Sequence, residues 1–354
     1  RLPWLIDFLS NLYDYSAMHP MTGFLLLTQF ADPAGNSRAG LVSADGQRIR
    51  EINANKGVYG LATAALQRGR KLAQQIEAQG FLGEHDYDTL VQSGRLLPPV
   101  THPDPARCML SGTGLSYRAS AEGRDAMHKA AAAGNATDTI RMYEIGEAGG
   151  RPPEGQIGSP PEWFYKGDGS SLVAPGADLP LPAFAEDGGD EVELAGVYIV
   201  DANGDPVRIG VTLSNEYADH EIEKQNYLYL AHSKLRAAAI GPELLVGEVP
   251  GSFPGEIVIR RDRDTIWRKG FALGEDHMCH TIGNLEHHHF KYAQFRRPGD
   301  VHVHFFGAAA VSFSEGVKTQ PGDVFEISAQ PFTKPLVNRI AAVPDEGLIE
   351  VRAL

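Results

Sequence analysis

The sequence predicts an α+β fold in which strands are more numerous than long helices. The chain has 39 glycines and 23 prolines among 354 residues, a generous supply of turn-forming residues. The strongest local signal is Asn203-Gly204, which separates the apolar runs 191–200 and 206–213 and is typical of a β-hairpin turn. Hydrophobic residues make up 42% of the chain, which is enough for a substantial core.

The first part of the chain predicts a small α+β domain over residues 21–105. The runs 23–30 and 39–42 flank a turn-rich segment, so we expect a small antiparallel meander. From Val58 to about Gln79, apolar residues recur on one face at helical spacing, which predicts a helix that Gly80 ends. A proline-rich segment then closes this domain.

Residues 106–354 predict one larger catalytic domain, richer in strands. Its hairpin is followed by a polar and aromatic segment, 217–237, that could start a helix, and the runs 299–313 and 322–328 predict two late strands. Residues 1–20 lack the basic start and the uninterrupted apolar centre of a signal peptide. We expect them to be an artificial or upstream extension outside the fold.

Charge and cysteine content narrow the functional classes. The formal net charge of -13 argues against a nucleic-acid or anionic-membrane partner, because phosphate contacts need clustered Lys and Arg. Two cysteines, Cys108 and Cys279, cannot form a disulfide framework and fit a reducing cytoplasm. No run of about 18 or more apolar residues exists, so we expect no membrane-spanning helix.

The most informative feature is a pair of carboxylates, Glu191 and Glu193, in an apolar run. Residues two apart in a strand point to the same face, so the two carboxylates would lie together. Like charges at that spacing repel unless a proton or a cation sits between them. A third acid, Glu216, and the ammonium group of Lys234 complete a set that could hold a divalent ion and a substrate. This pattern favours an enzyme.

From about Gly112 to Asn338 the chain resembles the fumarylacetoacetate hydrolase superfamily, because several short motifs occur in the order of that family. The matching segments are GTGLSYRAS at 112–120, WFYKGDGSSLVAPGADLPLP at 163–182, Glu191 with Glu193, Asn215-Glu216, Lys234 followed by Gly241-Pro242, Pro298-Gly299-Asp300, Gly307, Pro321-Gly322-Asp323 and Leu336-Val337-Asn338. The segments HSKLRAAAIGPE and NLEHHHFKYAQFRRPGDVHVHFFG look like a bacterial branch that acts on 2-keto-3-deoxy sugar acids. The resemblance implies a mixed β-sheet roll behind the small N-terminal domain, and a homodimer.

The resemblance also implies a metal site made by Glu191, Glu193 and Glu216. An all-carboxylate set suits a hard cation, Mg²⁺ first and Mn²⁺ or Ca²⁺ next. The family usually has Asp at the third position, and Glu216 is one methylene longer, so the ion could sit slightly differently. Lys234 matches the active-site lysine of the family, and an ammonium group there can polarise a substrate carbonyl or its enolate.

Four further residues match positions that contact the substrate or the site in the family. Lys166, predicted as a second catalytic lysine, and Ser171 lie in the entry segment, where the usual Lys-Pro has become Lys166-Gly167. A role in the turn and a substrate contact both stay open for this pair. Tyr227 and Glu223 stand where the family has a tyrosine and a glutamine that contact the substrate. Because Glu223 replaces a neutral glutamine, the charge on this side of the substrate site differs from that of the family.

One departure bears on the reaction. Hydrolytic relatives carry a lid histidine that activates water for C–C cleavage, and the matching position here is Ser120, which we predict to contact the substrate. Serine cannot replace histidine as a general base near neutral pH without help. His128 could approach, although an exposed helical position is the simpler interpretation.

These observations predict a metal-dependent hydro-lyase. Its substrate would be a 2-keto-3-deoxy-pentonate, first of all 2-keto-3-deoxy-L-arabinonate, and its product 2,5-dioxopentanoate (α-ketoglutarate semialdehyde), as in non-phosphorylating pentose catabolism. Elimination releases water, so it needs no base that activates water; the base that removes the C3 proton stays open among Glu216, Glu223 and a lid residue. The alternatives are a hydrolase of a 2,4-diketo acid, a decarboxylase of an oxaloacetate-like acid, and a sugar-acid sensor without activity.

Two histidine-rich segments superficially suggest zinc. Residues 276–280 and 286–289 contain several histidines, but their spacing fits no closed four-ligand pattern, and His302 and His304 alternate as strand residues. We therefore predict aromatic packing or an interface for most of them.

Overall fold

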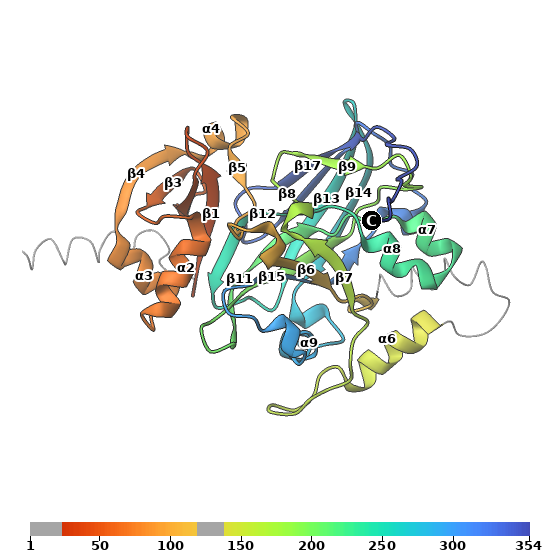
Figure 1. Ribbon diagram of the computed structural model, residues 1–354, viewed down its shortest axis with the longest axis horizontal. Helices are drawn as coiled ribbons and strands as arrows, with labels where there is room; N and C mark the ends of the chain where they lie inside the picture. The colour runs from red at the N-terminus through yellow and green to blue at the C-terminus, as the bar shows by residue number, and fades with distance from the viewer. Residues whose placement is uncertain (1–22, 119–137) are drawn as a thin grey trace, which may run out of the picture.

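The computed structural model describes residues 23–118 and 138–354, and there the predicted α+β class is confirmed (Figure 1). Most of the regular structure lies in two sheets, and the helices are short. The α-helices are α2 (Gly57–Gln67), α3 (Leu72–Gln79), α4 (Tyr87–Gln92), α6 (Asp138–Gly149), α7 (His220–Gln225), α8 (Leu230–Lys234) and α9 (Ile282–Phe290). Within the described ranges, no helix is long and apolar enough to cross a membrane.

The larger sheet carries the site. In spatial order its main path is β4 (Phe81–Asp86), β3 (Arg48–Ile52), β2 (Ser37–Val42), β1 (Phe24–Ala31), β12 (Ala238–Gly247), β11 (Pro206–Asn215), β10 (Val192–Val200), β15 (Val301–Ala310), β6 (Cys108–Gly112) and β7 (Phe164–Asp168). The short strands β5 (Leu96–Leu97) and β8 (Leu172–Val173) pair with β1 and β12. The sheet is mixed, because β6 runs parallel to β15 while β10 and β11 are antiparallel.

The smaller sheet packs against the larger one. Its order is β14 (Asp264–Leu273), β13 (Phe253–Arg261), β16 (Val324–Ala329), β17 (Leu336–Ala342) and β9 (Asp178–Leu181). Leu194 and Leu213 of the β10–β11 hairpin share one core cluster with Ile257 of β13. On the other face of the hairpin, Val197 shares a second cluster with Val58 of α2. The hairpin therefore lies between two cores, which fixes the position of its end.

The predicted N-terminal meander is present as β1 to β4, and the late strands appear as β15 and β16. The meander lies on the left of Figure 1, and β1 pairs with β12, so that Phe24 is opposite Gly247 and Thr28 opposite Glu243. The N-terminal strands thus continue the larger sheet. A separate domain over 21–105 remains a prediction.

The predicted helix from Val58 to Gln79 is wrong in its extent. The structure has two helices, α2 and α3, separated at residues 68–71. Gly69 adopts a φ of 60°, a left-handed conformation that glycine reaches without steric penalty and that commonly ends a helix. The helical spacing of apolar residues continues across the break because both helices face the same sheet. The spacing alone therefore does not indicate the turn between them.

Candidate active site

Three carboxylates meet at one end of the β10–β11 hairpin. Glu193 belongs to β10, Glu191 immediately precedes it, and Glu216 directly follows β11. The backbone N–H of Glu216 donates to the carbonyl oxygen of Glu191 at 2.9 Å, which brings the strand ends into register. Their ligand oxygens lie within 4.8 Å of one another, and all three residues are buried. The structure thus places the predicted ligands together, as the strand spacing indicated.

Two buried lysines contact this cluster. The Nζ atom of Lys234 lies 2.5 Å from Glu191 Oε1 and 2.6 Å from Glu216 Oε2. The Nζ atom of Lys166 lies 2.5 Å from Glu216 Oε1 and donates to the backbone oxygens of Tyr217 at 2.6 Å and Lys234 at 3.0 Å. An ammonium group has three N–H donors, so these contacts occupy those of Lys166. Lys166 therefore orders the backbone around Glu216, whereas Lys234 lies between two carboxylates.

The charges in the cluster are strongly coupled. Burial and the neighbouring carboxylates Glu216 and Glu191 raise the pKa of Glu193 well above its ordinary value. Burial also raises the pKa of Glu216, to about 7, although Lys166 and Lys234 oppose the rise. Burial acts on Glu191 in the same direction, but Lys234 and His220 hold its pKa well below the ordinary range. Burial lowers the pKa of Lys166, and Glu216 offsets part of that effect.

The donor set fits a hard divalent cation. Within the described residues, no other group of three His, Cys, Asp or Glu side chains brings its ligand atoms close enough to share an ion. All the donor atoms are oxygens, which Mg²⁺ and Ca²⁺ prefer. Three buried carboxylates of one sign also repel one another, and a cation between them would relieve that repulsion. The residues present therefore match the predicted metal site.

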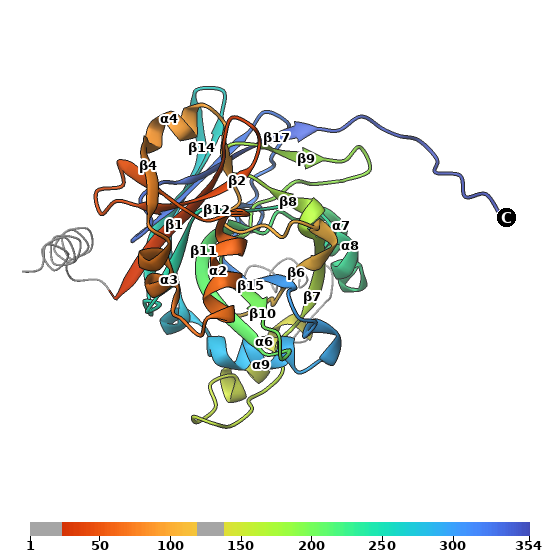
Figure 2. The ribbon, with the colours of Figure 1, turned by 60° about the vertical axis from the view of Figure 1, so that its left-hand side comes forward.

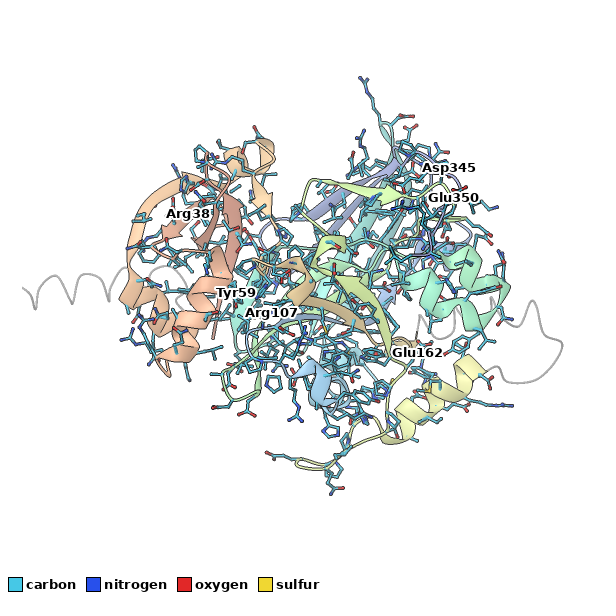
Figure 3. The ribbon with its side chains drawn as sticks, in the orientation of Figure 1. Arg38, Tyr59, Arg107, Glu162, Asp345 and Glu350 are labelled. Atoms are coloured by element: carbon cyan, nitrogen blue, oxygen red, sulfur yellow. The ribbon has the colours of Figure 1, made fainter. Side chains whose placement is uncertain are left out.

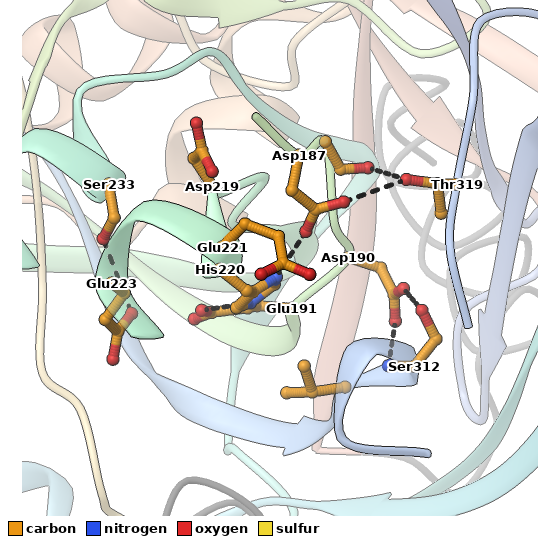
Figure 4. Close-up of polar contacts among 12 residues, drawn as sticks. Asp187, Asp190, Glu191, Asp219, His220, Glu221, Glu223, Ser233, Ser312 and Thr319 are labelled. Atoms are coloured by element: carbon orange, nitrogen blue, oxygen red, sulfur yellow. Dashed lines mark hydrogen bonds and ion pairs between the residues drawn. The ribbon is translucent and has the colours of Figure 1, made fainter. Parts of the chain in front are cut away.

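A second group of polar residues, which sequence reasoning missed, holds Glu191 in place (Figure 4). His220, at the start of α7, places Nε2 3.0 Å from Glu191 Oε1 and Nδ1 3.3 Å from Asp187 Oδ2. Burial opposes the charged form of His220, but the hydrogen bonds to Asp187 and Glu191 outweigh it and raise its pKa to about 10. Asp190 accepts hydrogen bonds from the hydroxyl and the backbone N–H of Ser312. No motif pointed to these contacts because the fold joins segments that lie far apart in the sequence.

On the opposite side of the cluster, Gly307 supplies a backbone donor. Its N–H donates to Glu193 Oε2 at 2.7 Å, and its φ of 102° is a conformation that favours glycine. A Cβ added there would lie 2.9 Å from the Cβ of Ser116, so the position also requires a small residue. The glycine that matches the family turn therefore fixes one oxygen of a predicted ligand.

The predicted substrate-binding residues have different placements. Ser120 lies outside the described residues, as does His128. A Cβ added to Gly167 would lie 3.0 Å from the hydroxyl oxygen of Ser171, so this serine covers the turn after Lys166, as the turn role requires. Glu223 is buried on α7, with Oε2 3.5 Å from the hydroxyl of Ser233.

Tyr227 leads to an acid that sequence reasoning missed. Its hydroxyl donates to Glu162 Oε1 at 2.8 Å, and Glu162, which lies just before β7, is buried (Figure 3). Glu162, Phe164 and Lys166 are all buried, whereas Tyr165 is exposed, so the three residues lie towards the interior of the molecule. The ring of Phe164 lies 4.9 Å from Lys234 Nζ, which places the start of β7 beside the cluster. The alternation in PEWFYKG was the available signal.

Three histidines of the late segments, His289, His302 and His304, pack together as the predicted aromatic packing requires. His289 Nε2 lies 3.0 Å from His302 Nδ1, and the ring of His289 stacks on that of His304 with centroids 4.6 Å apart. The hydroxyl of Ser111 lies 2.9 Å from His304 Nδ1. These rings form an aromatic layer between α9 and β15.

The fold is similar to that of several solved enzymes. The apo form of 2-keto-3-deoxy-D-arabinonate dehydratase is 20% identical, with a TM-score of 0.64 over 90% of this chain and 100% of that one. The same enzyme complexed with magnesium and 2,5-dioxopentanoate is 19% identical, with a TM-score of 0.64 over 90% of this chain and 99% of that one. 5-Carboxymethyl-2-hydroxymuconate delta-isomerase from Mycobacterium smegmatis is 16% identical, with a TM-score of 0.54 over 90% and 100%. No family model matches the sequence, and no curated protein is significantly similar to it. At these identities the likeness is one of fold, and it agrees with the mixed-sheet fold that the resemblance implies.

Proposed function

We propose that this protein is a metal-dependent dehydratase that converts a 2-keto-3-deoxy-pentonate to 2,5-dioxopentanoate. The observation that carries the proposal is the buried cluster of three carboxylates and two lysines at the end of the β10–β11 hairpin. Support comes from the fold, which the chain shares with an enzyme solved with magnesium and 2,5-dioxopentanoate. We infer that the first substrate to test is 2-keto-3-deoxy-L-arabinonate.

Glu191, Glu193 and Glu216 would hold the ion. When bound, Mg²⁺ would supply positive charge that makes the C3 proton of a 2-keto acid easier to remove. The chain prepares this position in advance: Gly307 and His220 each fix one carboxylate oxygen, and the cluster is buried away from bulk water. Such preorganisation reduces the rearrangement needed when charge develops in the substrate.

Lys234 has the electrostatic role in this proposal. Its ammonium group lies between Glu191 and Glu216 and beside the ring of Phe164. The adjacent carboxylates favour its charged form, so it would stabilise negative charge on the C2 oxygen rather than remove a proton. Lys166 positions Glu216 and the backbone of Lys234 instead of reaching the substrate.

Glu162 is the residue that we assign to proton transfer. It is a buried carboxylate just before β7, two residues from Phe164, and the hydroxyl of Tyr227 orients it. The carboxylate takes the C3 proton, the C3–C4 double bond forms, and the C4–O bond breaks. The same carboxyl group can return its proton to the departing hydroxyl, which leaves as water. Two proton shifts then give 2,5-dioxopentanoate. In the first, a C5 proton is lost and C3 gains one, which leaves a C4–C5 enol; in the second, the enol O–H proton is lost and C4 gains one.

Glu162→Gln tests this assignment. The substitution keeps the shape of the side chain but removes its proton-accepting oxygen, and general acid–base groups contribute roughly 10²–10⁴-fold to rates. We therefore expect Glu162→Gln to slow product formation by about that factor, with unchanged Mn²⁺ binding in electron paramagnetic resonance titrations. Exchange of the C3 hydrogens in unreacted substrate in D₂O, followed by NMR, reports the proton-transfer step itself.

Tyr227→Phe is the matched control, because it removes a donor to Glu162 and leaves the carboxylate in place. We expect a smaller loss of rate and a shifted pH profile. A Glu162→Gln variant with the rate of the wild type would place the base elsewhere, and loss of Mn²⁺ binding would show that the residue is structural. Formation of pyruvate by the wild type would contradict dehydration altogether.

A further inference from the structure

The segment after β17 leaves the body of the molecule. The N–H of Val343 donates to the carbonyl oxygen of Leu181 at 2.9 Å, and from there the chain runs outward as an extended arm, residues 344–354 (Figure 2). Within the described part of the chain, the hydrogen bond found in this arm is local, from the N–H of Gly347 to Asp345. The arm therefore has no packing partner in its own described chain.

The arm carries apolar side chains that are exposed to solvent. Leu348 and Val351 are 89% and 92% exposed, and Ile349 and Leu354 are exposed as well. Removing such side chains from water is favourable, so an arm of this composition gains free energy by docking on an apolar surface. Its charges are Asp345, Glu346 and Glu350 against Arg352, three negative and one positive, a net of -2.

A groove of about 780 Å³ lies between the α2–α3 helices and the ends of three central strands of the larger sheet, β1, β11 and β12. Its apolar walls include Phe24 of β1, Leu66 of α2, Leu72 of α3 and Ile209 of β11. Its charged rim carries Arg70, Lys71 and Arg208 against Glu248, three positive and one negative, a net of +2. Groove and arm thus both carry apolar side chains and are opposite in net charge.

We propose that the arm of one copy of this chain docks in the groove of a second copy. Figure 3 shows Asp345 and Glu350 on one side of the molecule and Tyr59 of α2 on the other, and in Figure 2 the arm points away from α3. The arm therefore presents its apolar residues to a neighbour and not to its own groove. Fully extended, it spans roughly 35–40 Å, which is sufficient to cross to another molecule.

Opposite charge and matching apolar surface identify a second copy as the occupant. If each copy donates its arm to the other, the contact is self-complementary and closes as a symmetric dimer. The two exchanged arms would then bury Leu348, Ile349 and Val351 twice in the dimer. This interface is independent of the proposed reaction.

A disulfide pair tests the contact directly. The native cysteines Cys108 and Cys279 are buried, so a disulfide between introduced cysteines forms without competition from them. We expect Val351→Cys combined with Leu72→Cys to form a covalent dimer on a non-reducing gel. The matched control combines Val351→Cys with Leu82→Cys, because Leu82 is exposed on β4 outside the groove and should not cross-link.

A charge exchange gives a second, non-covalent test. Lys71→Glu should weaken the dimer at least tenfold in sedimentation equilibrium, and adding Glu350→Lys should restore it. Ending the chain after Ala342 should give monomers whose circular dichroism matches the wild type. A wild-type monomer at every concentration, a cross-link within one chain, or an unchanged dimer without residues 343–354 would each overturn the proposal. A disulfide between Leu72→Cys and Leu5→Cys within one chain would also overturn it, since residues 1–22 would then occupy the groove.

Discussion

Glu216 links the two lysines of the cluster. The resemblance implies an aspartate at this position, and the longer side chain here reaches two ammonium groups, with Oε1 2.5 Å from Lys166 and Oε2 2.6 Å from Lys234. Removing one partner of such a buried pair leaves an uncompensated charge, which costs about 3–5 kcal/mol. Glu216 therefore both completes the proposed ligand set and neutralises the lysines beside it.

Glu193 provides the sharpest test of the metal site at the residue scale. It belongs to the predicted ligand set, and its oxygen Oε2 accepts a hydrogen bond from a backbone N–H. We expect Glu193→Gln to weaken Mn²⁺ binding by at least about 10–100-fold, the range that even indirect partners of a metal reach. Isothermal titration calorimetry measures the affinity.

Glu286→Gln is the control for that substitution, because Glu286 is a partly buried carboxylate that hydrogen-bonds Tyr198 and Arg208 away from the cluster. Its Mn²⁺ affinity should equal that of the wild type. If Glu193→Gln bound Mn²⁺ as tightly as the wild type does, Glu193 would not be a ligand of the metal.

At the scale of elements, the contact between β15 and α9 makes stability depend on pH. Burial lowers the pKa of His302 to about 4 and that of His304 to about 3. Burial, with His304 and His302 nearby, also lowers the pKa of His289. The folded state therefore keeps these rings neutral, while the unfolded chain takes up protons below about pH 6.5. Their contribution to stability is present above that pH and is lost as the pH falls towards the folded values.

The size of the effect follows from linkage. Between pH 7.5 and 5.5, His304 alone should remove about 1.4 kcal/mol from the free energy of unfolding. In urea denaturation over the same pH interval, the free energy of unfolding of His304→Gln should therefore fall by about 1.4 kcal/mol less than that of the wild type. His287→Gln, at an exposed position of α9, is the matched control. Identical losses in His304→Gln and the wild type would contradict the account.

Sequence pattern predicted local elements better than their pairing. Alternation and the Asn203-Gly204 turn located the β10–β11 hairpin, and with it Glu191 and Glu193. The helical period failed at Gly69 because two helices on the same sheet continue one apolar stripe. The parallel pairing of β6 with β15 joins residues almost two hundred positions apart, and no local pattern records such a contact.

The candidate site was predictable where its residues lie in motifs. Lys234 and the three glutamates follow from spacing and resemblance, and the structure brings them together. Glu162 and His220 did not emerge, because their partners, Tyr227 for one and Asp187 for the other, reach them only through the fold. Their proximity is a property of tertiary structure.

At the scale of the whole molecule, one sheet connects the N-terminal meander to the candidate site. Pairing of β1 with β12 carries the N-terminal strands to β11 and β10, whose ends hold the carboxylates. The smaller sheet and α2 pack on opposite faces of the β10–β11 hairpin, as the two core clusters show. A closely packed support of this kind holds charged groups of one sign together, which a flexible loop would allow to separate.

The most direct test of the central claim is the product formed from 2-keto-3-deoxy-L-arabinonate, followed by NMR before and after Mg²⁺ is added to chelator-treated protein. We predict no turnover without the ion and formation of 2,5-dioxopentanoate once Mg²⁺ is restored. Formation of pyruvate, or turnover that chelation leaves unchanged, would contradict the account.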